Sequence, residues 1–139
     1  MVSRVLVAMD DSEMARRALA YAFDAHPVAE ITVLHVVGGG SPVMGEAASV
    51  ALEEGFEDEE DAHGQAVFER AREMAAERGR AVDTELAYGS AAQSIVEHAD
   101  GFDVVVVGAH SGSLVERLFT GNTAEKVVKQ SPVPVTTVR

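Results

Sequence analysis

Arg4-Val5-Leu6-Val7-Ala8-Met9-Asp10-Asp11-Ser12 joins a short apolar run directly to residues that start helices. An unbroken apolar run of this length is typical of a strand buried on both faces, as in a parallel sheet. Asp and Ser at its end favour the start of a helix. Apolar positions from Met14 to Phe23 then recur at helical spacing until Pro27. The stretch therefore predicts a strand that leads straight into a helix.

The alternation of strand and helix patterns continues along the chain. We expect further strands at residues 30–37, 81–88, 103–107 and 133–138, and further helices that carry Val67, start at Ser90 and span Asn122 to Gln130. This alternation predicts an α/β three-layer sandwich, in which a five-stranded parallel sheet has helices on both faces. The polar alternation of residues 81–88, and Pro134 inside the last strand, place these two strands at the edges of the sheet.

The composition limits the classes of function. The chain has 139 residues, 47% of them hydrophobic, which indicates one globular domain. Eleven Lys and Arg against 23 Asp and Glu give a net charge of −12, which argues against binding to nucleic acid or anionic membranes. The absence of cysteine excludes disulfides and thiol catalysis. No apolar run approaches the roughly 20 residues of a membrane span and no leader precedes the first strand, so we expect a cytoplasmic protein.

The excess of acidic residues also suggests a working environment. Lys126 and Lys129 are the only lysines, whereas alanine and valine are abundant. This composition fits a halophilic protein, because concentrated salt screens the repulsion between like charges. An ordinary acidic protein is the alternative, and full stability in dilute buffer would favour it.

Three residues lie at the carboxyl ends of expected strands. They are Asp10, Val37 and Gly108, at the ends of the first, second and fourth strand patterns. Open parallel sheets bind their ligands outside the carboxyl ends of the strands, at the point where the strand order changes direction. We therefore expect the functional site where these three residues meet.

The segment from Gly108 to Thr123 carries the residues best suited to hold an anion. Gly108 lets a ligand approach the backbone closely, and Ser111 to Ser113 leave amides and hydroxyls free. Gly121 and the two residues after it open the last helix, whose N-terminus attracts phosphate. Two such stretches in one loop indicate a polyphosphate ligand, although two plain glycine turns would look the same.

Several other phosphate-binding and catalytic patterns do not fit. Gly40 to Gly45 has the spacing of a P-loop, but Glu46 stands where the phosphate-binding lysine belongs, and no dinucleotide fingerprint follows the first strand. Ala109 to Ser113 resembles a nucleophile elbow, but no histidine follows His110 to complete a triad. Asp10-Asp11 suits a magnesium-binding receiver, but the third strand ends without an aspartate. The histidines lack metal-ligand spacing, and we expect His35 to be a core residue.

Longer stretches resemble one known family. They are Val5–Glu13, Leu34–Val37, Gly89-Ser90, Gly108–His110, and Thr123–Val128 continuing into Ser131–Val135. Together they resemble the universal stress protein family over nearly the whole chain, and the last stretch is the most specific of them.

The resemblance implies a fold, an assembly and a ligand. It implies a single Rossmann-like domain over residues 1–139, with strand order 3-2-1-4-5, and a homodimer joined through the last strand, Val133–Val138. One branch of the family binds ATP and another does not. In the ATP-binding branch, Asp10 would lie near adenosine, and Val36 or Val37 would meet adenine through backbone groups. The residues that would surround ribose and phosphates are Gly108, His110, Ser111, Gly112, Gly121, Asn122 and Thr123.

The chain departs twice from the glycine pattern of the ATP-binding branch, G-x2-G-x9-G-S/T. Ser111 occupies the position of the middle glycine, and Asn122 occupies the hydroxyl position. A serine adds a Cβ that costs about 1 kcal/mol or more if the position needs a positive φ. Asn can still cap the helix and donate to a phosphate oxygen. The resemblance thus implies an altered phosphate site rather than a lost one.

Together with the resemblance, these observations predict a stress-response protein that binds ATP, ADP or AMP, with or without Mg²⁺. We expect it to act as a sensor or regulator. The helix pattern turns Glu116, Arg117 and Glu125 toward solvent, so the loop supplies no convincing general base. Two alternatives stay open. One is a dimeric interaction module of the same family that binds no nucleotide and acts through unknown protein partners, and the other is a slow Mg-dependent ATPase.

Overall fold

A computed structural model describes residues 1–38, 57–109 and 122–139 of the chain. The elements, in chain order, are β1 (Arg4–Ala8), α1 (Glu13–Ala25), β2 (Glu30–Val37), α3 (Glu57–Ala76), β3 (Asp83–Tyr88), α4 (Ala91–Ala99), β4 (Val104–Gly108), α6 (Asn122–Gln130) and β5 (Val135–Val138). Among the helices of these ranges, none has the length and apolar character needed to cross a membrane.

The five strands form one parallel sheet in the order β3-β2-β1-β4-β5. This confirms the order that the family resemblance implied, and it confirms β3 and β5 as the edge strands. β1 lies in the middle, and the chain proceeds toward one edge through β2 and β3 and then toward the other through β4 and β5. The direction therefore changes between β1 and β4, which is where ligands of such sheets bind.

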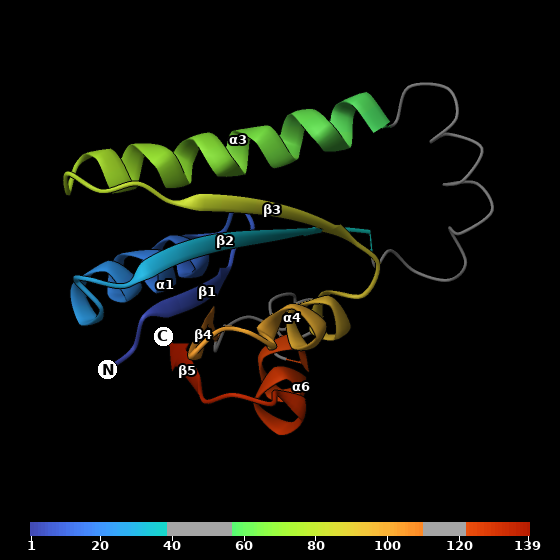
Figure 1. The fold of residues 1–139 in the computed structure, drawn as a ribbon. Helices are drawn as coiled ribbons and strands as arrows, with labels where there is room; N and C mark the ends of the chain where they lie inside the picture. Colours follow the sequence, from blue (N-terminus) through green and yellow to red (C-terminus); the bar gives the residue numbers. More distant parts are fainter. Residues whose placement is uncertain (39–56, 110–121) are drawn as a thin grey trace.

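The sheet is covered on both faces, as expected (Figure 1). One core lies between the sheet and helices α1 and α3, and the other between the sheet and helices α4 and α6. Successive residues of β1 alternate between them, with Val5 and Val7 in the first core and Leu6 in the second. A strand that must bury both faces needs apolar residues throughout, which is why residues 5–7 form an unbroken run.

The helices begin and end where the sequence predicts. Ser12 is the N-cap of α1 and accepts a hydrogen bond from the Ala15 N–H, and Ser90 has the same role for α4. Gly79 follows α3 in a turn with φ of 65°, a conformation that favours glycine. The expected apolar faces are buried, including Leu19 on α1 and Ala71 on α3.

Some details differ from the expectations. β5 begins at Val135 rather than Val133, because Pro134 lacks the N–H that a strand residue would donate. The alternation of residues 81–88 places Tyr88 on the apolar face of β3, but this residue is 64% exposed at the end of that edge strand. Apolar residues recur at helical spacing from Leu114 to Phe119, but this stretch lies outside the described residues, as do residues 39–56.

The start of β1 is held to the turn that precedes β4. The Oδ2 atom of Asp103 accepts hydrogen bonds from the backbone N–H groups of Ser3 and Arg4, at 2.8 and 2.9 Å. The Arg4 guanidinium donates to the Gly101 carbonyl at 2.8 Å and lies over the Phe102 ring. The hydrogen bond from Ser3, followed by the one from Arg4, lowers the pKa of Asp103 below its ordinary value of 3.8.

This lowered pKa predicts a pH-dependent contribution to stability. The contribution is present above the ordinary pKa of 3.8 and disappears as the pH falls through the lower folded-state value. Asp103→Ala should therefore destabilise the protein at about pH 7, and the difference in unfolding free energy from the parent chain should shrink at about pH 3. Urea unfolding at the two pH values measures it, with Asp83→Ala as an exposed control. A difference that does not depend on pH would contradict the assigned role.

Candidate functional site

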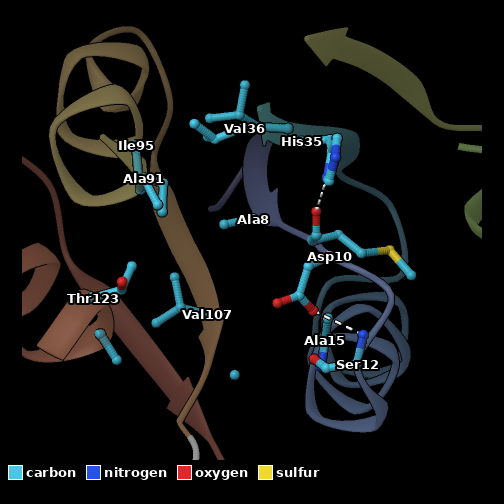
Figure 2. Close-up of a pocket in the computed structure, with 14 residues that line it drawn as sticks. Ala8, Asp10, Ser12, Ala15, His35, Val36, Ala91, Ile95, Val107 and Thr123 are labelled. Carbon is cyan, nitrogen blue, oxygen red and sulfur yellow. Dashed lines mark hydrogen bonds between the residues drawn. The ribbon is translucent and has the colours of Figure 1, made fainter. Parts of the chain in front are cut away.

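A cavity of about 150 Å³ opens at the carboxyl ends of β1, β2 and β4, and α4 and the first turn of α6 border it (Figure 2). It lies at the predicted place, beside the change in strand order. Its lining residues are Ala8, Met9, Asp10, Ser12, Ala15, Leu34, His35, Val36, Ala91, Ile95, Val107, Gly108, Thr123 and Ala124.

Asp10 presents an oriented carboxylate to this cavity. It follows β1 directly, and its Oδ1 atom accepts a hydrogen bond from the Ser12 N–H at 2.8 Å. Figure 2 shows the other carboxylate oxygen directed toward the space between Asp10 and Val107. Because the first oxygen is already bonded, the side chain is held in place and the second oxygen is available to accept a hydrogen bond from a ligand.

The backbone of Val36 faces the cavity, whereas that of Val37 does not. Leu34 O accepts from Met9 N on the β1 side, and Val37 O accepts from Gly89 N on the β3 side. Backbone groups alternate in direction along a strand, so the N–H and C=O of Val36 point to the β1 side. Since β1 ends at Ala8, these two groups meet the cavity instead of a neighbouring strand. Of the two predicted valines, the structure brings only Val36 into the site.

Apolar side chains from several elements form the rest of the wall. Ala91 and Ile95 come from α4, and Ala8 and Val107 come from the two adjacent strands (Figure 2). An apolar cavity of about 150 Å³ is large enough for a benzene-sized ring. The described cavity therefore has the size and chemistry for a planar ring, with polar groups at one side to orient it.

The N-terminus of α6 stands at the opposite side of the cavity. Thr123, in its first turn, lines the cavity, and Figure 2 places it across from Asp10. A helix N-terminus offers free amides and the positive end of the helix dipole to an anion. No lysine or arginine is among the described residues that line the cavity. A phosphate there would therefore depend on amides, hydroxyls or a bound cation for its charge balance.

Only some of the predicted site residues line the described cavity. Asp10, Val36, Gly108 and Thr123 line the cavity, and Val37 lies beside it with its carbonyl bonded to Gly89. Asn122 begins α6. His110, Ser111, Gly112 and Gly121 lie outside the described residues, as does the side chain of Asn122. The prediction missed the contribution of α4 because Ala91 and Ile95 have the same pattern as ordinary core residues.

Gly108 is required by packing as well as by its place in the site. A Cβ on this residue would lie 2.8 Å from the carbonyl oxygen of Met14 and 2.9 Å from its carbonyl carbon. Those atoms are backbone in the first turn of α1, so they cannot move without shifting the helix. The glycine therefore allows β4 to pass directly beneath the start of α1, close to Asp10.

His35 is a core residue, as predicted. It is 6% exposed, and its Nδ1 atom donates to the Met9 carbonyl at 2.9 Å. The Met9 carbonyl, just after the end of β1, therefore accepts from a side chain rather than from a neighbouring strand. Within residues 1–38, 57–109 and 122–139, no cluster of three potential metal ligands is present.

Comparison with known proteins identifies the family. The model of the universal stress protein family matches residues 1–139. The universal stress protein YxiE of Bacillus subtilis is 34% identical over the full length of both chains. The chain belongs to the universal stress protein family. Among solved structures, the universal stress protein UspA from Lactobacillus plantarum superimposes with a TM-score of 0.76 at 26% identity, over 99% of this chain and 98% of that one.

Some solved universal stress proteins of this fold contain an adenine nucleotide. One structure is a complex with cAMP, with a TM-score of 0.70, 24% identity and coverage of 99% and 97% of the two chains. The Archaeoglobus fulgidus protein was solved with dAMP, with a TM-score of 0.70, 19% identity and coverage of 100% and 98%. An Arabidopsis thaliana member was solved with AMP bound, with a TM-score of 0.67, 21% identity and coverage of 98% and 90%. At these identities the likeness to the present universal stress protein shows a shared fold.

The close approach of Gly108 to the Met14 backbone predicts that adding one methyl group at this position lowers stability. In this universal stress protein, Gly108→Ala should destabilise the fold by about 1–3 kcal/mol, because overpacking forces the backbone to shift. Gly64→Ala is the matched control, since its Cβ would meet only the side-chain atoms Leu86 Cδ1 and His35 Cδ2, at 3.3 and 3.4 Å. Its effect should stay within about 1 kcal/mol. Chemical unfolding measures both, and equal effects would contradict the assigned contact.

Proposed function

We propose that this universal stress protein binds an adenine nucleotide in the cavity beside β1 and acts as a sensor or regulator in a stress response. The observation that carries the proposal is the pairing of an apolar cavity with the backbone groups of Val36 and the oriented carboxylate of Asp10. The solved family members that hold cAMP, dAMP and AMP support the choice of adenine.

The proposed orientation places the base against β2. Adenine carries a hydrogen-bond donor next to an acceptor on one edge, and the C=O and N–H of a single residue can pair with that edge. Val36 is the residue whose two backbone groups face the cavity, and Ile95 and Val107 supply apolar contacts to the faces of the ring. The free oxygen of Asp10 would then accept a hydrogen bond from a ribose hydroxyl.

The phosphate end would lie toward α6. Its N-terminus, with Thr123, provides the amides and hydroxyl for one or more phosphates. Because the described lining has no basic side chain, ATP would need a cation such as Mg²⁺ more than AMP would. Glu125, the acidic residue nearest to this end in sequence, forms an ion pair with Lys129 at 3.0 Å. The described residues therefore favour binding over efficient hydrolysis.

The carboxylate of Asp10 provides the test. Asp10→Asn keeps an oxygen that can accept from the Ser12 N–H, but it replaces the cavity-facing oxygen with an amide that donates. AMP binding measured by calorimetry should weaken by about tenfold. Asp11→Asn is the matched control, because its side chain is 73% exposed and does not line this cavity. It makes the same change of charge one residue away.

Two outcomes would contradict the proposal. If the parent chain binds neither AMP nor Mg·ATP, the non-binding interaction module becomes the better description of the protein. If Asp10→Asn and Asp11→Asn have equal effects on affinity, the nucleotide binds elsewhere. Steady release of phosphate from ATP that survives repurification would instead favour the slow ATPase.

We further propose that two copies associate through β5, as the family resemblance implied. β5 is an edge strand, and Val105 and Ala109 donate to Pro134 and Val138 from its inner side. The N–H and C=O of the alternate residues Val135 and Thr137 therefore point to the open edge, where a second strand can pair with them. Protein partners other than a second copy, and the cytoplasmic location, stay predictions.

The exposed backbone of Thr137 gives the test of this dimer. Thr137→Pro removes the outward N–H and should weaken dimerisation by at least about tenfold in sedimentation equilibrium. Thr137→Val is the control, since it keeps the N–H and suits a strand. Circular dichroism verifies that both variants fold. A monomeric parent chain, or a dimer unaffected by the proline, would rule out this interface.

A further inference from the structure

A second cavity, of about 140 Å³, lies between α1 and α3. Its lining residues are Met9, Asp10, Asp11, Arg16, His63, Ala66, Val67 and Arg70. It shares only Met9 and Asp10 with the nucleotide cavity, and helix α3 contributes to this cavity but not to the first. The proposed nucleotide site therefore leaves it unused.

Two arginines and a histidine from two helices line this second cavity. Arg16 comes from α1, and His63 and Arg70 come from α3. Arg16 is held in position, because its Nη1 atom donates to the Asp11 carbonyl at 2.8 Å and its Nη2 atom to Glu13 at 3.0 Å. A fixed guanidinium is pre-organised to bind an oxyanion, since less side-chain entropy is lost on binding.

Arg70 has donors to spare. Its contact among the described residues is an ion pair with Glu73 on the same helix, with 3.3 Å between Nη1 and Oε2. A guanidinium carries five N–H donors, so most of those on Arg70 are not used by this contact. The pair is exposed on the helix surface and of the i,i+3 type, which contributes little to stability.

The two acidic side chains of the lining, Asp10 and Asp11, each have a contact of their own. Asp10 directs its carboxylate to the Ser12 N–H and the first cavity (Figure 2). Asp11 is 73% exposed, with its Oδ2 atom 3.8 Å from His63 Nε2. The remaining wall is apolar, with Val67 fully packed beneath it and Met9 beside it. The side chains of Arg16 and Arg70, which line this partly open cavity, are 32% and 51% exposed.

We propose that this cavity is a second ligand site, which binds a small oxyanion of the phosphate or carboxylate class between Arg16 and Arg70. A guanidinium can donate to two oxygens of one oxyanion, and bidentate contacts of this kind are the strong ones. The apolar wall leaves room for a short carbon group attached to the anion. The inference does not depend on the first cavity, because the decisive residues belong to the second alone.

The test is a titration observed residue by residue. The parent chain is titrated with inorganic phosphate, and separately with succinate, against sodium chloride of matched ionic strength. Nitrogen–proton NMR spectra follow the Nε–Hε signals of Arg16 and Arg70 and the backbone amides of His63 and Arg70. At least one probe should produce saturable shifts at these signals with a Kd of about 1 mM or tighter. The probe that binds more tightly distinguishes phosphate from carboxylate.

Two arginine variants distinguish binding in this cavity from general attraction of anions to positive charge. Arg70→Gln removes the guanidinium at the cost of an exposed ion pair and should weaken binding by about tenfold. Arg17→Gln removes the same charge and a similar exposed pair with Glu13 on α1, away from the cavity lining, and should leave the Kd unchanged. The proposal is overturned if neither probe gives saturable shifts, or if the two variants weaken binding equally.

Loss of this site is distinguishable from failure of the proposed nucleotide site. Arg70→Gln should leave AMP affinity unchanged, since Arg70 does not line the first cavity. Phosphate shifts confined to Thr123 and its neighbours in α6 would place the anion in the nucleotide site and contradict a second one.

Discussion

The site depends on the point at which the central strand stops. β1 ends at Ala8, whereas the neighbouring β2 continues to Val37. Met9 N donates to Leu34 O, and His35 Nδ1 then occupies the Met9 carbonyl, so the sheet pairing between the two strands closes at this step. The chain bends away at Asp10, and the backbone of Val36 is left facing a space rather than a strand. A buried, hydrogen-bonded histidine thereby sets the boundary between the sheet and the binding cavity.

The same bend explains the arrangement of its surroundings. Ser12 caps α1 and donates its N–H to Asp10, so the start of the helix and the orientation of the carboxylate are determined together. Position 108 requires glycine because the Met14 backbone, in the first turn of α1, leaves no room for a Cβ. The residues just after β1 therefore border two cavities, one toward α4 and α6 and the other toward α3. Both cavities thus border the short segment between the end of β1 and the start of α1.

Most of the fold was accessible from the sequence, because each element has its own local signal. The unbroken apolar run of residues 5–7 indicated a strand buried on both faces, Ser12 and Ser90 indicated helix starts, and Pro134 indicated an edge. The strand order itself came from the family resemblance. The position of Asp10 could also be predicted, since it follows the first strand. Its orientation depends on a hydrogen bond to a residue two positions later, which the Asp-Asp-Ser sequence only suggests.

Other features of the site depend on relations between distant segments. Whether Val36 or Val37 faces the cavity is decided by the register of β2 against β1 and β3, which no local pattern encodes. The wall formed by Ala91 and Ile95 has the sequence pattern of ordinary core. Arg16 and Arg70 are 54 positions apart in the sequence, and the packing of α3 beside α1 brings them to one cavity.

Binding of an adenine nucleotide in the cavity beside β1 is tested most directly on the protein as purified. The chain is purified in high salt, denatured and filtered, and the released small molecules are identified by chromatography and mass spectrometry. We predict an adenine nucleotide in an amount close to stoichiometric with the chain, or stoichiometric uptake of added Mg·ATP or AMP by a chain that is purified empty. An empty chain that takes up neither nucleotide would contradict the claim.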